Sequence, residues 1–258
     1  MTAGYVDFEF DLPEALLAKL IEIFAELASA PLTLENVAAI PEAQGVYQLF
    51  LDATLVYIGK TDAEAGLNKR LSRHYSKIQQ RQNLEPSRIS FKAVRVYVFT
   101  AVDLEAQLIK FYNATSAVEW NQSGFGSNDP GRQRDTTRYK EGHFDLAYPI
   151  DIDRELGLVI GSNVPAYEIL NAIKQRVPYT FRFELAGRGA RRAHADLEKP
   201  IQIDVVALAP LTARAVLKEV VRQLPAGWQA TKLPSTLILY KERRAYDQGE
   251  IIARSSDA

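Results

Sequence analysis

Two periodicities of hydrophobic positions organise the first 120 residues of the chain. Leucine, isoleucine and phenylalanine recur at helical spacing over residues 13–29, 67–82 and 103–114, which predicts three amphipathic helices. Alternating apolar residues rich in β-branched and aromatic side chains predict a strand at 89–101. Residues 45–60 read as two strands joined by a tight turn at 52–54, so we expect a β-hairpin there.

Helix-start and loop signals support these assignments. Asp11 precedes the first helix as an N-cap candidate with Pro13 close behind it, and Asp103 has the same position before the third helix. Residues 124–135, GFGSNDPGRQRD, are dense in glycine, asparagine, aspartate and proline, which predicts a loop.

The pattern of predicted helices and strands changes after about residue 150. Helical patterns at 164–177 and 211–224 alternate with predicted strands at 179–185, 201–208 and 235–242. These elements suffice for a second small α+β unit of ordinary domain size. We therefore divide the α+β chain into a helical segment at 1–39, a first domain at 40–149 and a second domain at 150–258.

Composition excludes several classes of protein. The 258 residues include 47% hydrophobic and 24% charged side chains, as is ordinary for a globular chain. The absence of cysteine excludes disulfides, thiolate zinc sites and a cysteine nucleophile, and three histidines argue against a multi-histidine metal site. No signal-peptide pattern and no apolar run of membrane-spanning length is present, so we expect a soluble cytoplasmic protein with no membrane partner.

The net charge of −1 conceals a segregation along the chain. Residues 1–59 hold nine acidic and one basic side chain, whereas residues 60–140 hold fourteen basic and eight acidic ones. Chance clustering of surface charge is one explanation. The other is that the middle segment faces a polyanion such as nucleic acid, whose phosphates attract clustered lysine and arginine.

Polar residues of the first domain form an ordered set. Tyrosines lie in both hairpin strands, an arginine and a histidine four residues apart share one helix face, and a glutamate opens a later helix. Each alone has an ordinary explanation in packing, solvation or the helix dipole. The set consists of Tyr47, Tyr57, Lys60, Arg70, His74, Glu105 and Asn121.

Together these residues contain what phosphodiester hydrolysis needs. A single carboxylate such as Glu105 suffices for Mg²⁺, which keeps most of its waters. A tyrosine could activate water only if neighbouring cations favoured its phenolate, because its ordinary pKa is about 10. Lys60, Arg70 and His74 are the candidate cations, and Arg70 can also grip phosphoryl oxygens bidentately.

The order GVY, VYIGK, Arg and His four apart, helix Glu and later Asn resembles the GIY-YIG nuclease superfamily. The stretches EAQLIKFY, WN and GFGSNDPGR are similar to its branch of type II restriction endonucleases that cut a GC-only palindrome, CCGCGG. The resemblance covers residues 40–135. It implies a small antiparallel sheet flanked by helices, with Glu105 binding one magnesium ion, for which Mn²⁺ is expected to substitute.

The same resemblance implies roles for the other residues. Tyr47 and Tyr57 would share one site across the hairpin, with Gly59 permitting close backbone approach and Lys60 tuning the phenol. Arg70, His74 and Asn121 would complete the catalytic set. We expect double-stranded DNA as the partner and a homodimer on a palindromic site. Candidate DNA contacts are Arg73, Lys77, Asn128, Arg132 and Arg134.

Two other functions stay open at this point. One is a GIY-YIG nuclease of repair or mobile-element type, although the first domain shows no helix-hairpin-helix or zinc-finger pattern. The other is a non-catalytic DNA-binding module with a decayed nuclease fold, against which stands the presence of all seven candidate residues.

Overall fold

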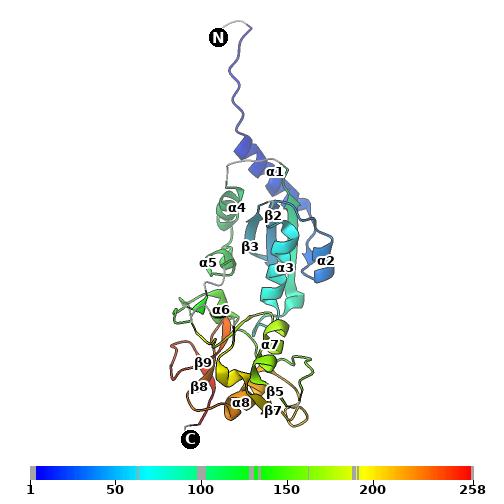
Figure 1. The fold of residues 1–258 in the computed structure, drawn as a ribbon. Coiled ribbons are helices and arrows are strands. Elements are labelled where there is room, and N and C mark those ends of the chain that lie inside the picture. Colours follow the sequence, from blue (N-terminus) through cyan, green and yellow to red (C-terminus); the bar gives the residue numbers. More distant parts are fainter. Residues whose placement is uncertain are drawn as a thin grey trace. The chain divides into compact units, whose positions relative to one another are not determined.

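The computed structural model describes residues 4–62, 64–97, 103–127, 131–132, 135–161, 163–187, 190 and 192–256. Its α+β chain forms two compact units (Figure 1). Unit 1 consists of Met1–Tyr75 and Glu85–Gly126, and unit 2 of Ser76–Leu84 and Ser127–Ala258. None of the helices in the described part of the chain has both the length and the apolar character that crossing a membrane requires.

A four-stranded antiparallel sheet forms the centre of unit 1. Its strands, in spatial order, are β1 (Ala30–Pro31), β4 (Ile89–Arg95), β2 (Gly45–Leu51) and β3 (Thr54–Thr61). The predicted hairpin is confirmed: β2 and β3 pair directly, and the turn between them has positive φ at Asp52 (47°) and Ala53 (66°). Aspartate tolerates this left-handed backbone better than most residues do, which helps to close the turn.

Helices flank this sheet as the hydrophobic spacing predicts. Asp11 accepts a hydrogen bond from the backbone N–H of Glu14, and Asp103 from that of Ala106, so both predicted N-caps are confirmed. The helix predicted over 67–82 ends earlier, at Ile78, because Gln80 has a positive φ of 52°. The helices are α1 (Leu12–Glu26), α2 (Leu34–Ala38), α3 (Leu67–Ile78), α4 (Leu104–Asn113) and α5 (Glu119–Gln122).

The pleat of β2 sends alternate side chains to opposite faces of the sheet. Val46 packs with Ile58 of β3 against apolar residues of α1 and α4, forming the core of one face. Tyr47 points to the opposite face, where it meets His74 of α3. The face that carries α3 therefore also carries the tyrosine of β2.

Unit 2 is built around a second four-stranded sheet of mixed direction. The spatial order is β10 (Glu250–Arg254), β8 (Trp228–Lys232), β9 (Thr236–Lys241) and β6 (Thr180–Phe183), with β6 parallel to β9. Apolar residues of α7 (Ala166–Arg176) and α8 (Ala213–Gln223) share one core with this sheet. The remaining elements are α6 (Phe144–Ala147) and the paired strands β5 (Asn163–Pro165) and β7 (Pro200–Gln202), and two 3₁₀ turns lie at Pro86–Arg88 (in unit 1) and Ala195–Glu198.

Sequence patterning predicts part of unit 2. Both helices, the strand β6 and the strand β9 are confirmed. The strand predicted over 201–208 is wrong beyond Gln202, because the Asp204 carboxylate accepts hydrogen bonds from the N–H groups of Val206 and Ala207 and bends the chain into a turn. The strands β8 and β10 were not predicted.

The division between the units lies elsewhere than at the expected boundary of 149/150, since residues 127–149 belong to unit 2. Asp135 shows why. Its buried carboxylate accepts hydrogen bonds from Arg182 of β6 and from the hydroxyl of Tyr240 on β9. A loop tied to the sheet by a buried charge is part of the unit that contains the sheet.

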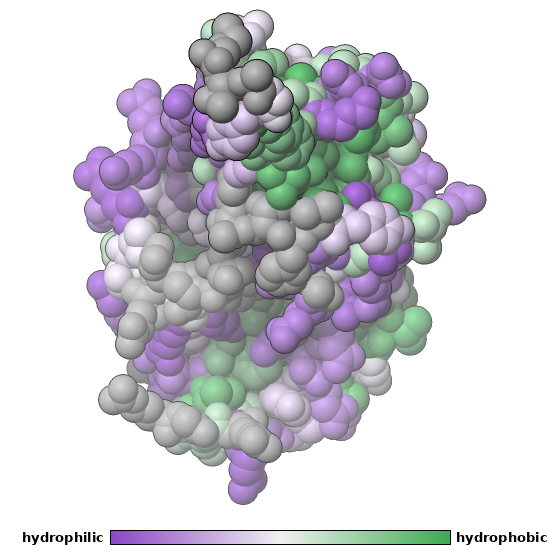
Figure 2. Space-filling view, turned by 90° about the horizontal axis from the view of Figure 1, so that it is seen from above, coloured by the Kyte–Doolittle hydropathy of each residue, from purple (hydrophilic) through white to green (hydrophobic). Residues whose placement is uncertain are grey.

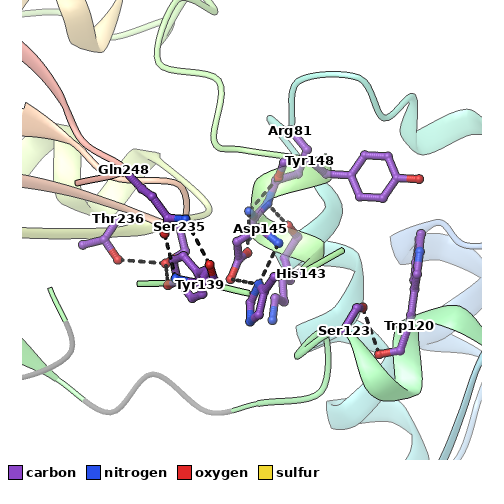
Figure 3. A network of polar contacts seen from close by, with 11 residues as sticks. Arg81, Trp120, Ser123, Tyr139, His143, Asp145, Tyr148, Ser235, Thr236 and Gln248 are labelled. Carbon is purple, nitrogen blue, oxygen red and sulfur yellow. Dashed lines mark hydrogen bonds and ion pairs between the residues drawn. The ribbon is translucent and has the colours of Figure 1, made fainter. Parts of the chain in front are cut away.

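A second buried charge joins other parts of unit 2 that lie far apart in the sequence (Figure 3). Arg81 is only 4% exposed, and its Nη1 donates to Asp145 Oδ1 of α6 at 2.8 Å and to the carbonyl of Tyr148 at 3.0 Å. Burial lowers the pKa of the Arg81 guanidinium, and the charge of Asp145 opposes that effect. The pair therefore holds residues 76–84 in unit 2.

Removing one partner of this pair should be costly. Asp145→Ala leaves a buried guanidinium without its counter-charge, so we expect the free energy of unfolding to fall by about 3–5 kcal/mol. The control is Glu22→Ala, which breaks the exposed ion pair with Lys19 on α1 and should cost at most ~1 kcal/mol. Urea unfolding of both variants measures the difference, and equal losses would contradict this assignment.

Candidate active site

The phenol of Tyr47 is the centre of the candidate site. Its side chain is fully buried, and its Oη lies 2.7 Å from Nε2 of His74. Arg70 donates from Nε to the same oxygen at 3.3 Å. Positions 70 and 74 lie one turn apart on α3, so the helix brings both side chains to one atom, as the spacing predicts.

Tyr57 joins this group from the neighbouring strand. Its ring centroid lies 6.1 Å from that of Tyr47 and 5.2 Å from that of His74. Gly59, which pairs with Tyr47 across the hairpin, permits this packing: a Cβ there would lie 2.3 Å from Tyr47 Oη. The expected close approach at Gly59 is therefore present, and it is made to the phenol.

Burial sets the protonation of both phenols. Desolvation is the largest influence on the pKa of Tyr47 and of Tyr57, and it raises both pKa values, while the charge of Arg70 opposes it. The expectation that nearby cations would favour phenolate is wrong for this arrangement, because the desolvation of two packed rings outweighs one half-buried guanidinium. Both tyrosines are neutral at physiological pH.

Glu105 lies in the first turn of α4. Burial raises the pKa of its carboxyl, while the positive charges of Lys60 and Arg70 lower it. Among the described residues, none makes a hydrogen bond or ion pair with this carboxylate. A half-buried carboxylate without a partner is a group that a divalent cation would neutralise.

Lys60 is held at the same helix end. Its Nζ donates to Asp103 Oδ1 at 2.8 Å, and Asp103 also caps α4. This contact places the lysine charge beside Glu105. The pKa of the Lys60 ammonium is raised, mainly by its hydrogen bond to Asp103 and to a smaller extent by the charge of Glu105. Lys60 thus acts on the carboxylate end of the site, whereas the sequence suggested that it tunes a phenol.

The donor set fits Mg²⁺ in one specific way. Within the described ranges no three histidine, aspartate or glutamate side chains gather as a metal cage. Mg²⁺ does not need one, since it is commonly held by one or two carboxylates with waters and substrate phosphate as the other ligands. Glu105 is the residue that would hold it.

Asn121 follows the site in sequence but directs its polar atoms to the edge of the sheet. Its Oδ1 accepts from the N–H of Ile58 and its Nδ2 donates to the carbonyl of Ile58, both at 2.8 Å. The amide therefore pairs with the backbone of β3 immediately after Tyr57. Asn121 therefore acts in the structure by holding the backbone of β3 in position.

Phe125 and Gly126 complete the site and were not singled out in the sequence. The ring of Phe125 is 1% exposed and stacks on His74 at 4.8 Å with an interplanar angle of 17°. A Cβ on Gly126 would lie 2.5 Å from Tyr57 Oη. The start of the predicted loop therefore packs on the two rings, and an aromatic residue between two glycines was the signal that could have indicated it.

The candidate DNA contacts are distributed over both units. Arg73 is exposed on α3 in unit 1. In unit 2, Lys77 lies 5.6 Å from the ring centroid of Phe144, and Arg132 makes two 3.0 Å hydrogen bonds to Glu184 and stacks 3.8 Å over Tyr240. Asn128 and Arg134 lie outside the described residues. Arg132 is thus already engaged within unit 2.

A scan of the chain against protein-family models and a search of curated proteins found no match.

The raised pKa of Glu105 has a consequence for stability. Below the ordinary pKa of a glutamate, the Glu105 carboxyl is protonated in both the folded and the unfolded state, so it has no effect on stability through its charge. Above its raised pKa in the folded state, Glu105 is ionised in both states, and burying that charge lowers the free energy of unfolding. Glu105→Gln should therefore stabilise the chain at pH 7 and have no such effect at pH 4. Urea unfolding at the two pH values measures this, with Glu14→Gln, an exposed first-turn residue of α1, as control. A gain of the same size at both pH values would contradict it.

Proposed function

We propose that this chain is a divalent-metal-dependent endonuclease that hydrolyses phosphodiester bonds of double-stranded DNA, of the GIY-YIG restriction type. The observation that carries the proposal is the buried Tyr47 hydroxyl held between His74 and Arg70, with the carboxylate of Glu105 near enough to raise the pKa of Tyr57 and to have its own pKa lowered by Arg70. One hydrogen-bond partner would satisfy a buried tyrosine hydroxyl, so stability alone does not require a guanidinium, an imidazole and a carboxylate together.

The proton path follows from the hydrogen bonds. Arg70 can only donate, so the Tyr47 oxygen accepts from it, and in the His74 tautomer whose Nε2 carries no proton the Tyr47 hydroxyl donates to Nε2. As a water attacks phosphorus, Tyr47 takes a proton from that water while its own proton passes to Nε2. A neutral phenol can act in this way without first becoming phenolate, which its raised pKa disfavours.

A cation held by Glu105 and the guanidinium of Arg70 would both stabilise the negative charge on the phosphate. When bound at Glu105, a magnesium ion supplies Lewis-acid stabilisation of phosphoryl oxygens and of the leaving oxygen. Arg70 is half-buried, so its guanidinium acts in a water-poor setting where charge stabilisation is strong. Lys60, fixed by Asp103, keeps a positive charge beside Glu105 and stabilises its ionised form.

DNA binding is supported by the charge of the segment that carries α3. Residues 60–140 hold the excess of basic side chains, and Arg73 is exposed on the helix that also carries Arg70 and His74. The restriction assignment rests on the sequence motifs, and it implies a palindromic site read by two copies.

Glu105 and Arg70 test the chemistry. Glu105→Ala should abolish cleavage and leave DNA binding intact or stronger, because a carboxylate near phosphate is removed. Arg70→Ala should also abolish cleavage, since it removes charge stabilisation worth on the order of 3 kcal/mol. The measurements are plasmid nicking in Mg²⁺ and gel shift in Ca²⁺, with Glu119→Ala of α5 as an exposed control. Cleavage by Glu105→Ala at the wild-type rate would refute the mechanism.

Phe125 tests the positioning of His74. Phe125→Leu keeps the site apolar but removes the ring that stacks on the imidazole, so we expect kcat to fall ~10–100-fold with DNA affinity unchanged. Phe91→Leu removes the same volume from a buried position on β4 and serves as the matched control. Equal effects of the two substitutions on kcat would show that Phe125 acts through stability alone.

A further inference from the structure

Arg95 and Tyr97 form a cation–aromatic pair on the surface of unit 1, at the end of β4. The guanidinium carbon of Arg95 lies 4.2 Å from the centroid of the Tyr97 ring. Arg95 is exposed and Tyr97 is 77% exposed, so packing in the core does not account for the contact. Mixed surface is visible in Figure 2, where hydrophobic side chains lie directly beside strongly hydrophilic ones. The pair is therefore available to a partner.

The register of the sheet places this pair on the face of the candidate site. Strands β2 and β4 pair directly at Tyr47 with Ala93 and at Gly45 with Arg95. Directly paired residues project to the same face, and diagonal positions such as 47 and 95 lie about 7–8 Å apart. The alternate residues of β4 project to the opposite face, which α1 and α4 cover. Arg95, with Tyr97 two positions on, thus extends the face that carries Tyr47.

The stacking leaves the hydrogen-bond donors of Arg95 free. A guanidinium on a ring uses its flat face, so the N–H groups in its plane are directed away from the ring. These donors match a carboxylate or a phosphate bidentately. In the part of the chain that the structure describes, no group accepts a hydrogen bond from this guanidinium and no carboxylate pairs with it. The pair therefore presents an oriented donor fork without an anion.

Arg132 shows which ligand such a fork takes. Its guanidinium lies 3.8 Å over the ring of Tyr240 in unit 2, and it donates two hydrogen bonds of 3.0 Å to the carboxylate of Glu184. The same stacking arrangement thus occurs with a carboxylate at Arg132 and without one at Arg95. We expect the anion that completes the fork of Arg95 to come from another molecule.

The proposed function identifies that molecule, and this inference rests on it. Duplex DNA bound for cleavage beside Tyr47 carries further phosphates on either side of the scissile one. We propose that Arg95, oriented by the ring of Tyr97, binds a backbone phosphate of the DNA that flanks the scissile bond. Such a contact positions the duplex and carries no sequence information.

The salt dependence of DNA binding tests the phosphate contact. Binding of a short duplex that contains CCGCGG is measured in Ca²⁺ over a series of salt concentrations. Arg95→Ala should raise the Kd roughly 10-fold and lower the slope of log K against log salt by about 1, since one phosphate contact is lost. The control is Arg244→Ala, which removes the same charge from a guanidinium 5.2 Å from the Tyr246 ring centroid in unit 2 and should leave the slope unchanged. An unchanged slope in Arg95→Ala, or equal changes in both variants, would overturn the proposal.

Two substitutions at Tyr97 test the orienting role of the ring. Tyr97→Leu keeps the charge of Arg95 but removes the stack, so we expect the Kd to rise ~3-fold or more with the salt slope of the wild type. Tyr97→Phe keeps the ring and should bind as the wild type does. The side chain is exposed, so folding is preserved in both variants. Wild-type affinity in Tyr97→Leu, or an equal loss in Tyr97→Phe, would contradict the orienting role.

Plasmid nicking by the wild-type chain in Mg²⁺ separates this inference from the proposed function. A wild type that binds the duplex but does not nick DNA would contradict the proposed function, while the comparison of Arg95→Ala with Arg244→Ala would still decide whether Arg95 binds a phosphate. A wild type that binds no duplex would overturn both.

Discussion

The candidate site depends on one constraint, which is that a fully buried phenol must satisfy its hydroxyl. Tyr47 projects from a central strand into the sheet face that α3 covers, and its side chain is fully buried there. A buried hydroxyl without partners costs free energy, and here the partners are Arg70 and His74. Two polar contacts thereby fix the register of α3 on the sheet. The same contacts bring the guanidinium of Arg70, the imidazole of His74 and the phenol of Tyr47 together.

The neighbours of Tyr47 are explained by the same constraint. Gly59 leaves the space that the hydroxyl fills, and Asn121 fixes the backbone of β3 next to Tyr57. Phe125 closes the aromatic group on the side of His74. Each of these residues restricts the position of a ring, so the site is held by packing as much as by hydrogen bonds. Such preorganisation is what charge stabilisation during a reaction requires.

Local rules made much of unit 1 predictable. The caps of α1 and α4, the hairpin and the i, i+4 relation of Arg70 and His74 depend on residues close in sequence, and each is present in the structure. What the sequence could not show is how deeply each group is buried. Whether the charge of Arg70 or desolvation dominates the pKa of Tyr47 depends on packing from α3 and from Phe125, which lie far away along the chain.

The same limit applies to unit 2. Asp135 and Asp145 read as ordinary acidic residues in a polar stretch, yet both are buried and paired with arginines about 47 and 64 positions away. Pairs of residues that lie far apart in the sequence leave no periodic signal. A boundary placed at 149/150 from the sequence pattern therefore assigns residues 127–149 to the first domain, although these charges attach them to unit 2. Arg132 illustrates the complementary point, because its basic character suggested DNA while its partner Glu184 lies in the same unit.

Charge segregation along the chain places a further condition on the proposed function. The acidic excess of residues 1–59 lies almost wholly before Gly45, and the hairpin at 45–59 carries only Asp52, at the turn. The hairpin is thus nearly neutral up to Gly59, and the cations of the candidate site are Arg70 of α3 and Lys60 near the end of β3. Phosphates drawn to that group would be repelled by the acidic residues that precede Gly45. DNA binding at the candidate site is therefore compatible with this charge pattern only if those acidic side chains are directed away from the duplex.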